Sequence, residues 1–243
     1  LHFGLGNLSG IDSISILWPD NKHQIITNLE VNKTVTITYK NANETSNLNS
    51  KSNTLFENIE PSSIGINYTQ KENNFNDFDL QLLLPQKQSE NSSALAVGDI
   101  NNDGLDDFFV GNAKDAVASL YVQKPNGVFV ETNPNLFHLD RIFEDTDAEF
   151  VDIDNDNDLD LYVTSGGYEN LENSKLLQNR LYLNNGKGIF KKTKLFENLI
   201  QTKKAVFSDF DQDGDQDVFL VGGVEHGRYP LSFEPYLLEN YKI

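Results

Sequence analysis

Polar and apolar residues alternate in short runs along the first 39 residues of the chain. The runs at 13–18 and 34–39 have a period of two, a shorter run at 24–27 lies between them, and Pro, Asp and Asn residues separate the runs. A period of two with such boundaries is typical of β-strands joined by turns. We therefore predict that residues 1–39 form a small β domain of three or four strands.

The alternation stops at residues 40–54, which are almost entirely polar. A segment of this composition cannot bury enough apolar surface to offset the entropy lost on folding. We predict that it is a linker between the small β domain and residues 55–243.

Short apolar runs recur in groups along residues 55–243, and an acidic loop separates the first two runs of each group. The expected strands are 94–97, 108–111, 119–122 and 127–130, then 148–151, 161–164, 180–183 and 188–191, and last 205–208, 218–221 and 236–238. The acidic loops begin at Asp99, Asp152 and Asp209, at intervals of 53 and 57 residues. Four strands in a repeat of this length are typical of a β-propeller blade. We predict an all-β fold, with about three four-stranded blades of an incomplete β-propeller in residues 55–243.

One further segment carries the pattern of a fourth blade strand out of order. The sequence at 56–59 resembles that at 129–132, but it precedes the first complete group of strands. Propellers often close by letting an N-terminal strand complete the last blade. We predict that residues 55–60 are such a closing strand; the alternative is an ordinary loop with one anchored Phe.

Each acidic loop matches the pattern D-x-[DN]-x-D-[GN]-x-x-D. Loop one is residues 99–107, loop two is residues 152–160 and loop three is residues 209–217. As such a loop curls, positions 1, 3 and 5 can turn their oxygens toward one point. Position 7 can offer its carbonyl, and the Asp at position 9 completes the set. Oxygen ligands that include several carboxylates are what Ca²⁺ requires.

We therefore predict about three Ca²⁺ sites. The predicted ligands are Asp99, Asn101, Asp103, Leu105 and Asp107; Asp152, Asp154, Asp156, Asp158 and Asp160; and Asp209, Asp211, Asp213, Asp215 and Asp217. Position 6 needs a permissive backbone, which Gly104 and Gly214 supply and which Asn157 tolerates. The alternative is a solvated acidic turn. We disfavour it because like charges about 4 Å apart repel by about 4 kcal/mol at an effective dielectric constant near 20.

The loops are not EF-hands, because position 12 is apolar where an EF-hand has Glu and because the flanking segments are predicted strands. The net charge is −18, from 37 acidic and 19 basic residues, and 14 of the acids lie in the three loops. This charge argues against a nucleic-acid binder. No run of 18 apolar residues is present, so we expect no transmembrane helix.

Known catalytic patterns are missing from the sequence. There is no Cys, and the four His residues form no triad or metal-binding spacing. Glu144 and Asp145 could act as an acid–base pair, but we interpret them as solvated loop residues. We expect no catalytic residue and a non-enzymatic protein.

The acidic loops resemble those of FG-GAP/VCBS-type repeats, the calcium-loop blades of integrin α-subunit propellers. Residues 1–39, with Phe3-Gly4-Leu5-Gly6 and Trp18-Pro19-Asp20, resemble the ASPIC/UnbV domain. The resemblance implies a secreted or surface-exposed module that binds or scaffolds a protein or polysaccharide partner. In a bacterium it implies a subunit of an outer-membrane assembly.

Two other interpretations follow from the same resemblance. The chain could be the non-catalytic part of a carbohydrate-active or other extracellular enzyme, or an integrin-like binder whose ions contact the partner. Propellers of this type usually have about seven blades. Because the chain also starts at Leu1 without a signal peptide, we expect it to be a piece of a longer protein.

Overall fold

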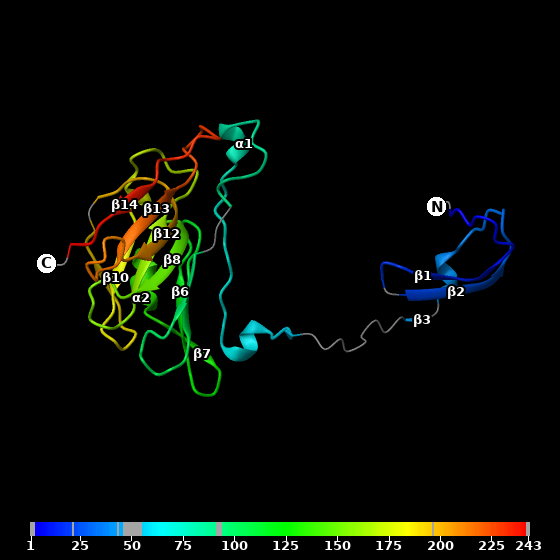
Figure 1. The fold of residues 1–243 in the computed structure, drawn as a ribbon, viewed down its shortest axis with the longest axis horizontal. Coiled ribbons are helices and arrows are strands. Elements are labelled where there is room, and N and C mark those ends of the chain that lie inside the picture. Colours follow the sequence, from blue (N-terminus) through cyan, green and yellow to red (C-terminus); the bar gives the residue numbers. More distant parts are fainter. Residues whose placement is uncertain are drawn as a thin grey trace. The chain divides into compact units, whose positions relative to one another are not determined.

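The computed structural model describes residues 3–20, 22–42, 44–45, 55–90, 94–195 and 197–241. The chain forms two compact units, residues 1–58 and residues 59–243 (Figure 1). The predicted linker, residues 40–54, overlaps the last elements of the first unit, and its residues 46–54 lie outside the described part of the chain.

The first unit contains an antiparallel sheet in the order β1-β2-β3. Strands β1 (Ile11–Leu17) and β2 (Lys22–Leu29) form a hairpin over two of the predicted runs. The third strand is β3 (Glu44–Thr45), which pairs with the start of β2. The alternating sequence therefore located the hairpin but not the strand that completes this sheet.

The predicted strand at 34–39 is wrong. The segment forms no strand and ends in the short 3-10 helix η1 (Tyr39–Asn41). The Tyr39 ring packs edge-on against Trp18 with ring centroids 5.2 Å apart, and its hydroxyl donates to Asp20 Oδ2 at 2.5 Å. These contacts hold the end of the segment against the β1–β2 turn. The segment therefore does not run along the edge of the sheet, where its backbone could pair with a strand.

The second unit contains three antiparallel sheets built from consecutive strands. Sheet I has the order β4-β5-β6-β7, sheet II has the order β11-β10-β9-β8, and sheet III has the order β12-β13-β14. The strands are β4 (Leu95–Gly98), β5 (Asp107–Val110), β6 (Ser119–Gln123), β7 (Phe129–Thr132), β8 (Asp145–Val151), β9 (Asp160–Ser165), β10 (Arg180–Leu183), β11 (Lys191–Thr193), β12 (Thr202–Ser208), β13 (Asp217–Gly222) and β14 (Tyr236–Leu238). The predicted strand groups are thus present in the predicted order.

Helical structure is confined to short connections, so the predicted all-β class is confirmed. The connections are η2 (Pro61–Ile64), α1 (Asp77–Leu80), α2 (Pro134–Leu139) and η3 (Lys175–Leu177). The described residues do not close into a barrel or a propeller.

The sheets are held together by apolar side chains between them. The first strands of neighbouring sheets follow one another in the order of the chain: β4 contacts β8, and β8 contacts β12. Figure 1 shows β8 beside β12. Strand β9 is buried along its whole length: Leu161 and Val163 join one apolar cluster, whereas Tyr162 joins the next. Successive side chains of a strand point to opposite faces, so one strand can serve two cores. This explains the continuous apolar run in its sequence.

The fourth strands β7 and β11 begin two or three residues later than predicted. Gly127 and Gly188 precede them with φ of 78° and 68°. This left-handed conformation suits glycine and belongs to the turn before the strand. The glycines therefore mark the turns and not the strands.

The predicted closing strand at 55–60 is not formed. These residues have no strand partner among the described residues, and the side chains of Leu55 and Phe56 are 95% and 89% exposed. A strand forms only beside another strand that offers unpaired backbone N–H and C=O groups. A sequence that resembles the other fourth strands does not provide such a neighbour.

Candidate metal centres

Each acidic loop joins the first strand of its sheet to the second. Loop one connects β4 to β5, loop two connects β8 to β9 and loop three connects β12 to β13. Position 9 of each loop is the first residue of the second strand. Because the two strands are hydrogen-bonded neighbours, the beginning and end of each loop are held close together.

The carboxylate at position 1 organises the curl of each loop. Asp99 accepts hydrogen bonds from the backbone N–H groups of Asp103 (3.1 Å) and Gly104 (2.7 Å). Asp152 and Asp209 accept the same two bonds, at positions 5 and 6, over 3.0–3.1 Å. Side-chain bonds of this local kind stabilise turns. The curl is therefore built from the loop's own backbone.

Two positions in each loop have a left-handed backbone. At position 6, φ is 84° for Gly104, 68° for Asn157 and 96° for Gly214, which confirms the expected need for a permissive residue. At position 4, φ is 59° for Asn102, 59° for Asn155 and 64° for Gln212. The sequence analysis missed position 4; the two Asn residues there were the available signal.

The curl brings carboxylates together in loops two and three. Ligand oxygens of Asp152, Asp154 and Asp156 lie within 4.8 Å of one another, and so do those of Asp209, Asp211 and Asp217. In loop one Asn101 replaces an acid at position 3, and no third acid comes that close among the described residues. Carboxylate oxygens at these separations repel one another. An all-oxygen set with several carboxylates fits Ca²⁺.

Position 9 has a further role that the pattern did not predict. Asp107, Asp160 and Asp217 are at most 1% exposed. Each accepts one bond from the backbone N–H at position 2 of its own loop, at 2.9–3.2 Å. Each also accepts one at 2.8 Å from the end of the third strand or just beyond it, donated by Gln123, Asn184 and Asn240. Position 9 therefore ties three strands of its sheet together.

Residues 99–163 match the family model of the FG-GAP-like repeat. This range contains loops one and two whole. Residues 1–44 match the family model of ASPIC and UnbV. Both matches confirm the resemblances seen in the sequence. No curated protein matches the chain.

No helix in the described part of the chain is long and apolar enough to cross a membrane.

Loops two and three are linked through position 7 of loop three. The Asn155 side chain of loop two donates to Asp215 Oδ1 at 2.6 Å in loop three. Asp158, at the same position in loop two, is 8% exposed, and its Oδ1 has no hydrogen-bond partner.

Asparagines after the third strand form a second link between neighbouring sheets. Asn184 Nδ2 donates to Ile100 O in loop one at 2.8 Å, and Asn240 Nδ2 donates to Ile153 O in loop two at 3.0 Å. Each therefore joins its own sheet to the acidic loop of the preceding sheet. The sequence analysis missed both residues, although each directly follows or nearly follows an apolar strand.

The loops differ in how strongly they hold protons. Burial, followed by the neighbouring acids, raises the pKa of Asp158 to about 6. Burial likewise raises the pKa of Asp160 to about 6, against the opposing backbone donors. Burial also acts to raise the pKa of Asp99, but amide donors from Gly104 and Asp103 outweigh it and lower that pKa. Loop two therefore holds the most poorly compensated negative charge, which a divalent cation would offset.

Proposed function

We propose that the chain is a non-enzymatic binding or scaffolding module of a larger surface protein, and that its three sheets are blades of a calcium-stabilised β-propeller. The observation that carries the proposal is the recurrence of one acidic loop, with one curl, at the same place in three successive sheets. Such a recurrence is expected when each repeat needs the same structural element.

Ca²⁺ would be held by the side chains at positions 1, 3 and 5, the carbonyl at position 7 and the carboxylate at position 9. When bound, the ion supplies positive charge that offsets the crowded carboxylates. The chain itself supplies the rest: the curled backbone aims the oxygens, and position 9 fixes the loop to its sheet. Each ion would thereby stabilise the hairpin that carries it.

The links between loops extend this stabilisation to the neighbouring sheets. The bonds from Asn155, Asn184 and Asn240 cross from one sheet or loop to the next. An ordered loop on one sheet therefore supports its neighbour. We infer that the ions stiffen a surface on which the protein presents binding groups, rather than taking part in chemistry.

We infer the location and the class of partner from the repeat type. The FG-GAP-like and ASPIC/UnbV matches support an extracellular or cell-surface protein, on the outer membrane in a bacterium. A protein or polysaccharide partner suits this setting. The charge of −18 disfavours nucleic acid.

Thermal unfolding in excess Ca²⁺ and in excess chelator tests the proposal. Binding to the folded state alone at 100 times the Kd stabilises by about 2.7 kcal/mol per site. About three sites should then raise the Tm by 10 °C or more. As a control, a variant with Asp99, Asp152 and Asp209 all changed to Asn should lose most of this response. An unchanged Tm in the chelator would contradict the proposal.

A further inference from the structure

Two acids, the buried Glu144 and the half-buried Glu169, lie at the other end of sheet II from loop two. Glu144 immediately precedes β8, whereas loop two follows it. Glu144 and Asp145 are only 5% and 4% exposed, so the interpretation of both as solvated loop residues is wrong. Asp145 is compensated by Arg180, whose Nη2 lies 2.5 Å from its Oδ1. Glu144 Oε2 is buried without a hydrogen-bond partner.

The second acid is Glu169, in the connection after β9. Its Oε1 accepts a bond from Asn73 Nδ2 at 2.5 Å, but its Oε2 is also buried without a partner. The two segments are held together by the Gly166 N–H, which donates to Glu144 O at 3.1 Å. A buried polar atom normally has a partner, because leaving it without one costs about 1–3 kcal/mol. Two such atoms side by side point to a group that both oxygens would share.

Gly167 leaves the space in which the two acids meet. A Cβ on this residue would lie 2.7 Å from Asn170 Nδ2, which donates to Gly166 O, and 3.0 Å from Glu169 Oε2 and 3.1 Å from Glu144 Oε2. The backbone there has φ of 98°, which favours glycine. Both free oxygens therefore lie within about one hydrogen-bond length of a common point.

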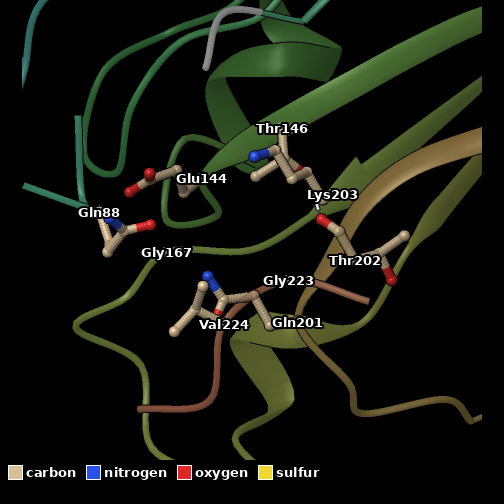
Figure 2. Close-up of a pocket in the computed structure, with 9 residues that line it drawn as sticks. All are labelled: Gln88, Glu144, Thr146, Gly167, Gln201, Thr202, Lys203, Gly223 and Val224. Carbon is tan, nitrogen blue, oxygen red and sulfur yellow. Dashed lines mark hydrogen bonds between the residues drawn. The ribbon is translucent and has the colours of Figure 1, made fainter. Parts of the chain in front are cut away.

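Glu144 and Gly167 line a small cavity of about 30 Å³ (Figure 2). In Figure 2 the Glu144 carboxylate points toward the side of the cavity that carries Gln88. One water needs roughly 10–15 Å³ of such space. The cavity therefore has room for water on the Glu144 side of the pair, and not for an organic ligand; Glu169 is not among the residues that line it.

The charges around the pair are mostly negative. Glu72 and Asp145 add to the field at Glu144, and burial followed by Glu169 raises the pKa of Glu144 to about 9. Arg180 is engaged with Asp145. Lys203 lines the cavity but is exposed. Among the described residues, neither Glu144 nor Glu169 forms an ion pair.

We propose that Glu144 and Glu169 form a cation site separate from the acidic loops, which takes a divalent metal ion such as Ca²⁺ between their free oxygens. Two carboxylates match the charge of a divalent ion, and oxygen ligands suit Ca²⁺. In the absence of the ion, the pair retains a proton. Binding therefore displaces that proton, and the affinity of this site falls by about tenfold for each pH unit below the raised pKa.

Counting bound Ca²⁺ by equilibrium dialysis of the whole 243-residue chain at about pH 8 tests the site. Glu144→Gln is expected to lose one ion per chain or to bind it at least tenfold more weakly, and so is Glu169→Gln. The matched control is Glu149→Gln, an exposed acid on the same strand, which should keep the full count. Far-UV circular dichroism shows that each variant is folded.

An unchanged count in both Glu144→Gln and Glu169→Gln would overturn the proposal and leave the pair as proton-sharing only. A gain of one ion in Lys203→Gln would overturn it too, because the lysine would then be the natural occupant. The test is independent of the acidic loops. If the loops bind no Ca²⁺, the unmodified chain should bind one ion and Glu144→Gln none.

Discussion

The two ends of sheet II both gather carboxylates, but they hold them differently. In loop two the acids are two residues apart, and Asp152 and Asp160 each accept two bonds from backbone N–H groups. At the other end Glu144 and Glu169 are 25 residues apart, and one oxygen of each is buried without a donor. The loop is thus pre-organised by its backbone. The pair depends on a proton or a cation to be stable.

Loop two itself contains a similar contrast. Asp160 is fully buried and accepts bonds from two backbone N–H groups. Asp154 is exposed, and its carboxylate oxygen lies near those of Asp152 and Asp156 as a candidate ligand. A residue of the first kind supports the fold with or without an ion. A residue of the second kind matters only when an ion is bound.

The largest expected effect separates these two kinds of residue. Asp160→Asn replaces one accepting oxygen by an NH₂ group that faces a backbone N–H, so we expect a loss of about 3 kcal/mol in the free energy of unfolding. Asp154→Asn should cost less than about 0.5 kcal/mol in the chelator. Urea unfolding without Ca²⁺ measures both, and equal losses would contradict the distinction.

The next effect appears only with Ca²⁺ present. Asp211→Ala removes one ligand from loop three, so the protein should bind one ion fewer and keep the other loops filled. The loss should be about 2–3 kcal/mol larger in excess Ca²⁺ than in the chelator, where Asp211 still accepts one exposed bond from the Asp213 N–H at 3.1 Å. Thermal unfolding in both conditions, with an ion count, checks this; a large loss in the chelator would show that Asp211 has a structural role.

For the pair Glu144 and Glu169 we expect a substitution to stabilise the protein, whereas the preceding substitutions destabilise it. The pKa of Glu144 is raised in the folded state to about 9, so the folded state keeps a proton that the unfolded state releases above its ordinary pKa of about 4.3. Stability without a cation should therefore fall as pH rises from about 5 to 9, by up to about 1.4 kcal/mol per pH unit. Glu144→Gln should flatten this slope and stabilise the protein by about 1–2 kcal/mol at about pH 8.

Urea unfolding over this pH range in the chelator measures the slope. Glu149→Gln is the control: burial and Asp147 raise the pKa of Glu149 too, but the side chain is exposed, so this variant should keep most of the slope. A slope that survives Glu144→Gln would assign the pH dependence to other acids.

The smallest effect concerns the backbone of loop two. Asn157 has φ of 68°, a conformation that glycine adopts without strain, so Asn157→Gly should stabilise the protein by up to about 1 kcal/mol. Asn155 has φ of 59° but also donates to Asp215, so Asn155→Gly should bring no gain. Equal gains in both variants would show that the bond from Asn155 contributes nothing.

Local patterns predicted much of the second unit. Alternation and apolar runs located the strands, because the period of two reflects the two faces of a strand. The spacing of Asp residues located the loops, because both the curl and its ligands lie within nine successive positions. The expected tolerance of Asn157 for positive φ is confirmed. The metal ligation itself stays a prediction.

The errors have a common origin. Residues 34–39 alternate as strands do, yet contacts from Tyr39 to Trp18 and Asp20 take the segment elsewhere. Residues 55–60 resemble a fourth strand but find no strand partner among the described residues. In both, the pattern describes the segment alone, whereas a strand also needs a neighbour.

The sequence by itself determined what depends on near neighbours: the all-β class, the strand order within each sheet, and three acidic loops with their turn-forming residues. Only the tertiary structure decided which distant residues meet. It placed Asn184 and Asn240 across neighbouring sheets and buried Glu144 beside Glu169. The physical reason is that a hydrogen-bonded turn is local, whereas burial and the loss of a hydrogen-bond partner arise only when segments far apart in the chain pack together.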